Sequence, residues 1–204
     1  MGWIERGDIL MLVAVATASL ALLQQAANPN PALESYTATA HLSVTLHAGV
    51  PIHETFNGTV YYRKPKRKIE FQNLPRRLSR FKDMAASAPT FEEVLQEYAV
   101  TPLSDNGTES RYVLVPKNPE SRIMSLEVTV NDVLALVTHA QWLYINGGEL
   151  QFDQSYTRAG RFELPLSDTV VAHFPGYNVD ATLSFTDYKP NATVSSSVFA
   201  SPGR

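Results

Sequence analysis

The stretch that decides the fold is YTATAHLSVTLHA, residues 36–48, in which apolar and polar side chains alternate over the whole length. Leu42, Val44 and Leu46 stand at even positions, and polar residues such as Thr45 stand between them. A period of two places successive side chains on opposite faces of a β-strand. The sequence therefore predicts one long strand with an apolar face and a polar face.

The same alternation continues into a predicted hairpin over residues 54–73. Phe56 and Val60 are apolar positions of its first strand, and the sequence KPK at 64–66 is typical of a tight turn. Gly58 lies in the middle of that strand and indicates a bulge or a bend.

One helix is predicted, over residues 90–99. Thr90 and Glu93 have the spacing of a capping box, which satisfies the first free amides of a helix. Apolar residues recur with the helical period on one face. They are Phe91, Val94, Leu95, Tyr98 and Ala99.

Short strands separated by turn sequences follow from residue 111 onward. Sequences such as Asn131-Asp132, Asn146-Gly147-Gly148 and Pro175-Gly176 favour tight connections, which predicts an antiparallel meander. The predicted strands are 111–115, 122–130, 133–144, 149–157, 169–174, 177–188 and a last one at 193–199.

The composition is that of an ordinary globular chain. With 204 residues and 44% hydrophobic content, we expect a single domain over residues 28–204. Cysteine is absent, which excludes disulfides, thiolate metal sites, a cysteine nucleophile and a lipidated cysteine. The net charge of -3 argues against nucleic acid as a partner.

The N-terminal 27 residues are predicted to be a signal peptide or an N-terminal anchor. Residues 9–23 are apolar or small, and a breaker-rich NPNP sequence follows at 28–31. This order is typical of a cleavable leader. An uncleaved anchor remains open, although the run is short for a membrane span of ~20 residues. A buried core helix is the third interpretation.

The predicted sheet has far more apolar surface than one helix can cover. A sheet of about eight to ten strands with one apolar face must curl, pack on another sheet or be covered by helices. We therefore expect it to wrap around the helix and enclose a ligand cavity, unless the side chains simply fill the interior. The candidate ligand-binding residues are Leu42, Val44, Leu46, Phe56, Val60, Tyr62, Phe91, Leu95, Tyr98, Leu126, Val128, Trp142, Phe152, Leu183 and Phe185.

The sequence carries no motif for catalysis or metal binding. His41 and His47 share a strand face but would lie about 20 Å apart at ~3.3 Å per residue, too far to hold one metal ion. We expect no catalytic residue, no metal and no cofactor. Asn57, Asn106 and Asn191 begin Asn-x-Thr sequences, and turn formation is the preferred interpretation for Asn106 and Asn191.

Basic residues gather between positions 63 and 82. Such a segment can dock anionic lipid head groups or an acidic partner, and it is equally compatible with a solvated hairpin edge. Nine of the 17 basic residues lie here: Arg63, Lys64, Lys66, Arg67, Lys68, Arg76, Arg77, Arg80 and Lys82.

The sequence GTVYYRKPKRKIE, residues 58–70, resembles the hairpin near the start of the LolA-like family, the periplasmic outer-membrane lipoprotein carriers. The order of leader, long strand, hairpin, amphipathic helix and meander agrees as well. The resemblance implies a mainly β fold: a curved antiparallel sheet forms an open half-barrel under one or two short helices. By similarity, Arg67 would help to hold the lid shut, with Arg63 and Lys66 as neighbouring contacts to a lid or partner.

This resemblance implies a non-enzymatic periplasmic carrier that binds acyl chains of lipoproteins or lipids. Phe91, Leu95 and Tyr98 would lie on the underside of the lid. A membrane surface or membrane-bound lipoprotein machinery would be the further partner of a monomer. The alternative is an envelope sensor that binds a hydrophobic ligand and signals to a protein. Both are expected in the periplasm or cell envelope, exported or tethered by an uncleaved N-terminal segment.

Overall fold

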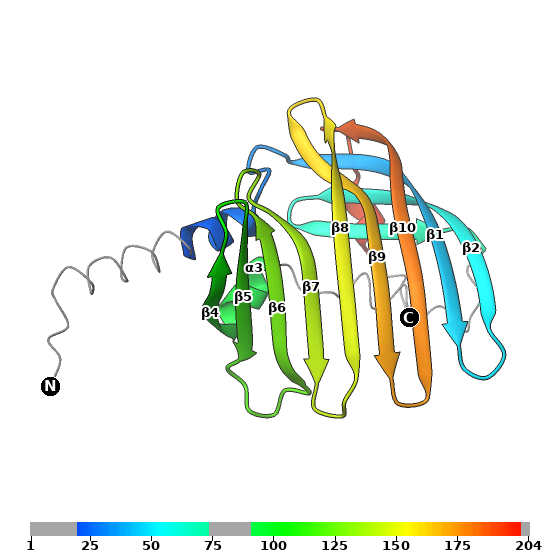
Figure 1. Ribbon diagram of the computed structural model, residues 1–204. Helices are drawn as coiled ribbons and strands as arrows, with labels where there is room; N and C mark the ends of the chain where they lie inside the picture. The colour runs from blue at the N-terminus through cyan, green and yellow to red at the C-terminus, as the bar shows by residue number, and fades with distance from the viewer. Residues whose placement is uncertain (1–19, 74–90, 201–204) are drawn as a thin grey trace, which may run out of the picture. The chain divides into compact units, whose positions relative to one another are not determined.

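The computed structural model describes residues 20–73 and 91–200 (Figure 1). These residues are mainly β, with ten strands, the helix α3 (Phe91–Glu97), the 3-10 helix η2 (Ser196–Phe199) and a helical stretch at 20–27. They divide into two compact units. One unit contains residues 20–29 and 91–145, and the other contains residues 30–73 and 146–200.

The larger unit is an antiparallel sheet built from both ends of the described chain. Its order is β3-β2-β1-β10-β9-β8, so β1 lies between β2 and the late strand β10 (Figure 1). The first strand of this order does not pair with the last, and the sheet is open. The strands are β1 (Ser35–His47), β2 (Ile52–Arg63), β3 (Lys66–Phe71), β8 (Glu149–Ala159), β9 (Phe162–Phe174) and β10 (Tyr177–Pro190).

The alternation predicted for residues 36–48 is confirmed in β1. Leu42 lies in register with Leu183 of β10 and with Phe56 of β2. Directly opposite residues of antiparallel strands share a face, so these side chains lie together. The buried core on this face contains Leu33, Tyr36, Ala38, Ala40, Val60, Ile69, Phe162, Leu164 and Phe185, with a second cluster of Val44, Ala172 and Val179.

Gly58 has a packing explanation, since the register of β2 with both neighbours continues through it without a shift. A Cβ atom at this position would lie 2.7 Å from the Glu70 carbonyl oxygen and 2.8 Å from Cδ1 of Phe71. The expected bulge is therefore wrong. Glycine is needed because the backbone and side chain of β3 approach too closely for any larger residue.

The smaller unit contains α3 and a four-stranded antiparallel sheet. The strands are β4 (Tyr98–Asp105), β5 (Glu109–Pro116), β6 (Ile123–Asn131) and β7 (Leu136–Tyr144), in the order β7-β6-β5-β4. Its most deeply buried side chains are Leu23, Tyr112, Leu114, Leu126, Val128, Val130 and Leu136. The Lys117 amide donates to the Glu97 carbonyl oxygen and ties the end of α3 to the end of β5.

Several element boundaries differ from the sequence prediction. The helix ends at Glu97, and Tyr98 begins β4, so the placement of Tyr98 and Ala99 on the helix is wrong. Residues 132–135 form a turn instead of the start of a strand, because the Asn131 side chain accepts from the amides of Val133 and Leu134. Residues 193–199 end in a 3-10 turn and form no strand.

Three sequence predictions fall partly or wholly outside the described residues. They are the apolar leader before residue 20, the capping box that begins at Thr90, and the basic residues Arg76, Arg77, Arg80 and Lys82. The division into a leader and one domain stays a prediction. Among residues 20–73 and 91–200, no helix has the length and apolar character needed to cross a membrane.

Candidate functional site

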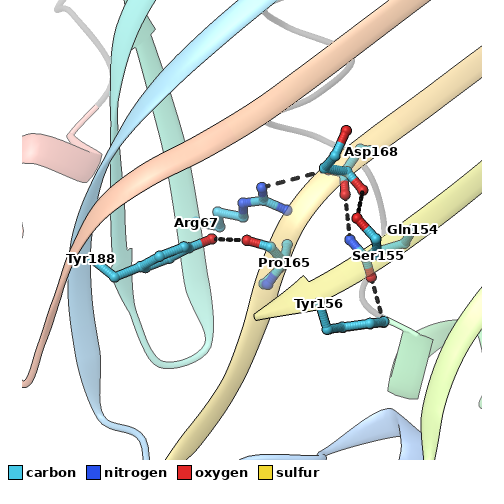
Figure 2. Close-up of polar contacts among 8 residues, drawn as sticks. Arg67, Gln154, Ser155, Tyr156, Pro165, Asp168 and Tyr188 are labelled. Atoms are coloured by element: carbon cyan, nitrogen blue, oxygen red, sulfur yellow. Dashed lines mark hydrogen bonds and ion pairs between the residues drawn. The ribbon is translucent and has the colours of Figure 1, made fainter. Parts of the chain in front are cut away.

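A group of polar side chains interrupts the apolar face of the larger unit. We call it the polar cluster, and it consists of Arg67 from β3, Gln154 and Tyr156 from β8, Asp168 from β9 and Tyr188 from β10 (Figure 2). Four strands far apart in sequence thus bring their polar groups together.

The strand register explains why charged residues point into this face. Asp168 lies opposite Leu183 on one side and Gln154 on the other. Arg67 lies opposite Tyr62, which in turn lies opposite the buried Tyr36. Because opposite residues share a face, both charges lie on the face that carries the apolar core.

Asp168 is held by a chain of hydrogen bonds within the sheet. The Gln154 amide nitrogen donates to Oδ1 of Asp168 at 2.6 Å, and the Tyr156 hydroxyl donates to Oε1 of Gln154 at 2.5 Å (Figure 2). Only 7% of the Asp168 side chain is exposed. Burial raises the pKa of this carboxyl, and Arg67 and the Gln154 bond oppose that rise in part.

Arg67 is a half-buried cation, with 36% of its side chain exposed, and it makes an unusual set of contacts. Its Nη2 lies 4.0 Å from Oδ2 of Asp168, which is too long for a hydrogen bond. Its guanidinium carbon lies 5.2 Å from the centre of the Phe185 ring, a cation–π contact. Burial by itself would lower the pKa of Arg67, but Tyr36 and Asp168 reverse this and the net direction is upward. The side chain is therefore a fixed positive charge.

Tyrosines surround the charged pair on the same face. Tyr36 stacks on Tyr62 with ring centres 5.0 Å apart, and it meets Tyr188 edge-on at 5.4 Å. The Tyr188 hydroxyl donates to the Pro165 carbonyl oxygen at 2.5 Å (Figure 2). Burial raises the pKa of the Tyr36 and Tyr188 hydroxyls. Both rings are therefore neutral at physiological pH and add apolar surface beside Arg67.

The nine candidate ligand-binding residues of the larger unit all lie on this one face. Phe56, Val60, Val44 and Phe185 are buried, whereas the others are half-buried. The half-buried ones are Leu42, Leu46, Tyr62, Phe152 and Leu183. The face is thus filled near the polar cluster and keeps partly accessible large side chains further along.

Solved structures similar to this chain share its fold. A domain described as an outer membrane lipoprotein-sorting protein from Vibrio parahaemolyticus covers 90% of this chain and 97% of its own length, with a TM-score of 0.63 and 13% identity. A LolA superfamily protein from Nitrosomonas europaea has the same coverage, a TM-score of 0.52 and 9% identity. A DUF1329 family protein from Desulfovibrio piger covers 90% and 96%, with a TM-score of 0.57 and 12% identity.

The fold is LolA-like. The predicted open antiparallel half-barrel is therefore confirmed as a fold class. No family model and no curated protein matches the sequence. At these identities the structural likeness establishes the fold, and the ligand must be argued from the residues of this chain.

The basic residues of the LolA-like hairpin take two different positions. Arg67 points into the apolar face, as described above, whereas Arg63 and Lys66 lie at the exposed end of the hairpin. A shallow cavity of about 220 Å³ is found there, lined by Arg63, Lys64, Pro65, Lys66, Ser196 and Phe199. Arg63 and Lys68 also donate to carbonyl oxygens of Val194 and Val198, which fixes the C-terminal segment beside the hairpin.

The other candidate residues belong to the smaller unit. Leu126 and Val128 are buried in its core, and Trp142 is half-buried opposite Leu126. Phe91 and Leu95 are half-buried on α3, while Tyr98 is buried at the start of β4. A single cavity lined by residues of both units stays a prediction.

Three histidines of the larger unit lie away from the polar cluster. His41 contacts Asn57, His47 contacts Asp180 at 2.8 Å, and His53 contacts Thr45, all at exposed positions. No group of three potential metal ligands occurs within residues 20–73 and 91–200.

Sequence reasoning missed Asp168, Gln154 and Tyr156. The predicted strand began at Thr169, whereas β9 begins at Phe162 and continues the apolar alternation through Leu164. Asp168 then stands at an apolar position of a long strand, with Val170 and Ala172 after it on the same face. A single carboxylate at such a position is the signal that could have identified the site.

Proposed function

We propose that this protein is a non-enzymatic binding protein of the cell envelope that carries an acyl chain of a lipid or lipoprotein. The observation that carries the proposal is the apolar face of the larger unit. Large apolar side chains on this face remain half-buried instead of being covered by other residues. Leu42, Leu46, Phe152 and Leu183 are such positions. Covering about 200 Å² of such surface would contribute roughly 5 kcal/mol.

The LolA-like fold supports this proposal, because one similar structure is described as a lipoprotein-sorting domain. Folds host many functions, so the similarity supports the ligand class and leaves the pathway to experiment. The apolar N-terminal stretch of the sequence supports export, and the periplasm is the compartment that we propose.

The polar cluster supports binding in place of catalysis. Asp168 is engaged with Gln154, and His41, His47 and His53 lie on the opposite face of the sheet. None of these three histidines can therefore act together with Asp168 as a general base.

Extraction of the purified protein with organic solvent, followed by mass spectrometry, tests the proposal directly. We expect bound lipid in the extract and binding of an apolar fluorescent probe by the extracted protein. The variant Leu183→Glu should lose most probe binding, because a carboxylate would enter the apolar face. The matched control Thr182→Glu lies next to it on the exposed face and should bind normally.

Absence of lipid in the extract, together with no probe binding by the unaltered chain, would overturn the carrier proposal. Equal probe binding by Leu183→Glu and Thr182→Glu would place the ligand elsewhere.

A sensor is the second candidate, and the exposed basic cavity at the β2–β3 turn favours it. Lys66 there belongs to β3, the same strand that carries Arg67 into the apolar face. A ligand on the apolar face would therefore lie against the strand whose first residue lines the basic cavity. Binding to an acidic protein that depends on ligand, without lipid transfer between vesicles, would favour the sensor over the carrier.

A further inference from the structure

The Arg67 side chain is 36% exposed, yet one donor of its guanidinium is buried without a hydrogen bond. Its group offers five N–H donors, and the Nε atom is inaccessible to solvent and has no hydrogen-bond partner. The large majority of buried polar side-chain atoms in proteins are paired. An unpaired Nε at a cation on an apolar face calls for a specific explanation.

Asp168 does not supply these bonds. Its Oδ1 accepts from Gln154, and its Oδ2 remains 4.0 Å from the nearest Arg67 nitrogen. A closed arginine–carboxylate pair has two parallel N–H···O bonds at about 2.7–2.9 Å. The carboxylate therefore balances the charge of Arg67 and leaves the exposed part of its guanidinium accessible to a ligand.

The surroundings of Arg67 suit the polar end of an amphiphile. The Phe185 ring lies beneath the guanidinium, and Ala40 of β1 lies in register with Phe185. From Ala40, the even positions Leu42, Val44 and Leu46 continue along the same face. Six residues at about 3.3 Å each give an apolar track of about 20 Å, comparable to an extended long acyl chain.

We propose that Arg67 binds the anionic head group, a carboxylate or a phosphate, of an amphiphile whose chain lies along β1. The proposal rests on the proposed function, because it names the ligand class of the same face. Arg67 makes the charge-assisted bonds to the head group. Asp168, fixed by Gln154, lies 4.0 Å from the guanidinium and balances its charge without forming a hydrogen bond to it.

Calorimetric titration of the lipid-free full chain with two ligands of equal chain length tests this assignment. One is a long-chain fatty acid and the other is the corresponding fatty alcohol. Hydrogen bonds to charged groups contribute about 1.5–3 kcal/mol. We therefore expect the acid to bind about tenfold to a hundredfold more tightly than the alcohol.

The variant Arg67→Gln should bring acid and alcohol to similar affinity while alcohol binding is retained. Arg67→Lys should restore part of the preference for the acid, because it restores the charge. Arg63→Gln, on the same hairpin but at the exposed turn, is the matched control and should leave the preference unchanged. Circular dichroism verifies that each variant is folded.

The outcomes separate this proposal from the proposed function. Equal affinity of the unaltered chain for acid and alcohol would overturn the head-group assignment and leave the carrier intact. Binding of neither ligand would contradict the carrier itself. Binding of inorganic phosphate as tight as that of a long-chain alkyl phosphate would show a free-anion site and would also overturn the assignment.

The variant Asp168→Asn gives a further test. If it lost the preference for the acid over the alcohol as completely as Arg67→Gln does, the two residues would act only as a structural ion pair, and the head-group assignment would be overturned. We expect instead that Asp168→Asn keeps the preference for the acid or increases it, because a competing negative charge is removed.

Discussion

At the scale of single residues, the carboxyl of Asp168 gives the larger unit a pH-dependent stability. Burial raises its pKa above the unfolded value of about 3.9. The folded state then binds more protons than the unfolded state between the two pKa values. The contribution of Asp168 to stability is therefore largest below the unfolded pKa and falls as the pH rises through the folded pKa.

The variant Asp168→Asn should lose this dependence. Relative to the unaltered chain, its free energy of unfolding should rise between pH 4 and pH 7, by about 1.4 kcal/mol for each unit of pKa shift. Urea denaturation of both proteins at pH 4 and pH 7 measures this change. The other carboxylates titrate equally in the two proteins, so their contribution cancels when one free energy of unfolding is subtracted from the other. A constant difference between the two proteins would contradict the expected direction of the shift.

Gly58 gives a second prediction at this scale. The variant Gly58→Ala would place Cβ 2.7 Å from a backbone oxygen of β3, and a backbone atom cannot move aside as a flexible side chain can. We expect a loss of about 1–3 kcal/mol in the free energy of unfolding, as for other overpacked positions. Thermal unfolding followed by circular dichroism checks it, and an unchanged midpoint would show that β2 and β3 separate easily.

At the scale of elements, the β4–β5 turn depends on one asparagine. Oδ1 of Asn106 accepts from the Thr108 amide at 3.0 Å, the Thr108 hydroxyl at 2.8 Å and the Glu109 amide at 2.8 Å. The turn interpretation of this Asn-x-Thr sequence agrees with these bonds. Gly107, at φ +81°, completes the turn in a conformation that favours glycine.

Asn106→Ala should therefore lower the free energy of unfolding by about 1 kcal/mol, the usual net value of such a bond. Ser104→Ala, exposed on the same hairpin, is the matched control and should have little effect. Chemical denaturation of both variants provides the comparison. Equal stabilities would mean that glycine alone determines this turn.

The elements also show which parts of the fold a sequence can predict. Strong alternation identified β1, the β2–β3 hairpin and β10, because one face of each strand is buried in the sheet. β4 was missed because its residues are mostly exposed, so the sequence from Ala99 to Asp105 carries no alternation. Tyr98 was misassigned since it is buried at a position that continues the helical period of α3 by coincidence.

The candidate site was predictable only in its apolar part. The residues of β1, β2 and β10 were found from their period of two. The polar cluster depends on which residues of β3, β8, β9 and β10 lie side by side, and the register with bulges near Ser155 determines that. The alternation of residues along one strand does not show which residues of the next strand lie opposite. Arg67 was identified only because it belongs to the hairpin that resembles the LolA-like family.

At the scale of the whole molecule, the distribution of charge predicts binding to an anionic membrane surface. The chain has a net charge of -3, yet Arg63, Lys64 and Lys66 line one cavity at the β2–β3 turn. We expect binding to vesicles that contain anionic phospholipid, weakening as salt is raised because the Debye length shortens from about 10 Å at 0.1 M to 3 Å at 1 M.

The double variant Lys64→Gln with Lys66→Gln should weaken this vesicle binding about thirtyfold, since each cation near an anionic surface contributes about 1 kcal/mol. Cosedimentation with vesicles measures it, and neutral vesicles serve as the control. The variant should keep its binding of the apolar probe. Unchanged cosedimentation would contradict the prediction and would mean that these lysines only keep the edge of the hairpin solvated.

The position of β1 between β2 and β10 has a consequence for how the protein is made. Tyr36 lies in register with Tyr62, which is synthesised soon after it, but also with Pro190, near the other end of the described chain. During translation β1 can form the hairpin with β2 and must then wait for its second partner. Such long-range pairing slows folding and leaves apolar surface exposed to aggregation until it is complete. The strand at the centre of the larger unit is therefore made early in the described chain and is enclosed only after β10 has been made.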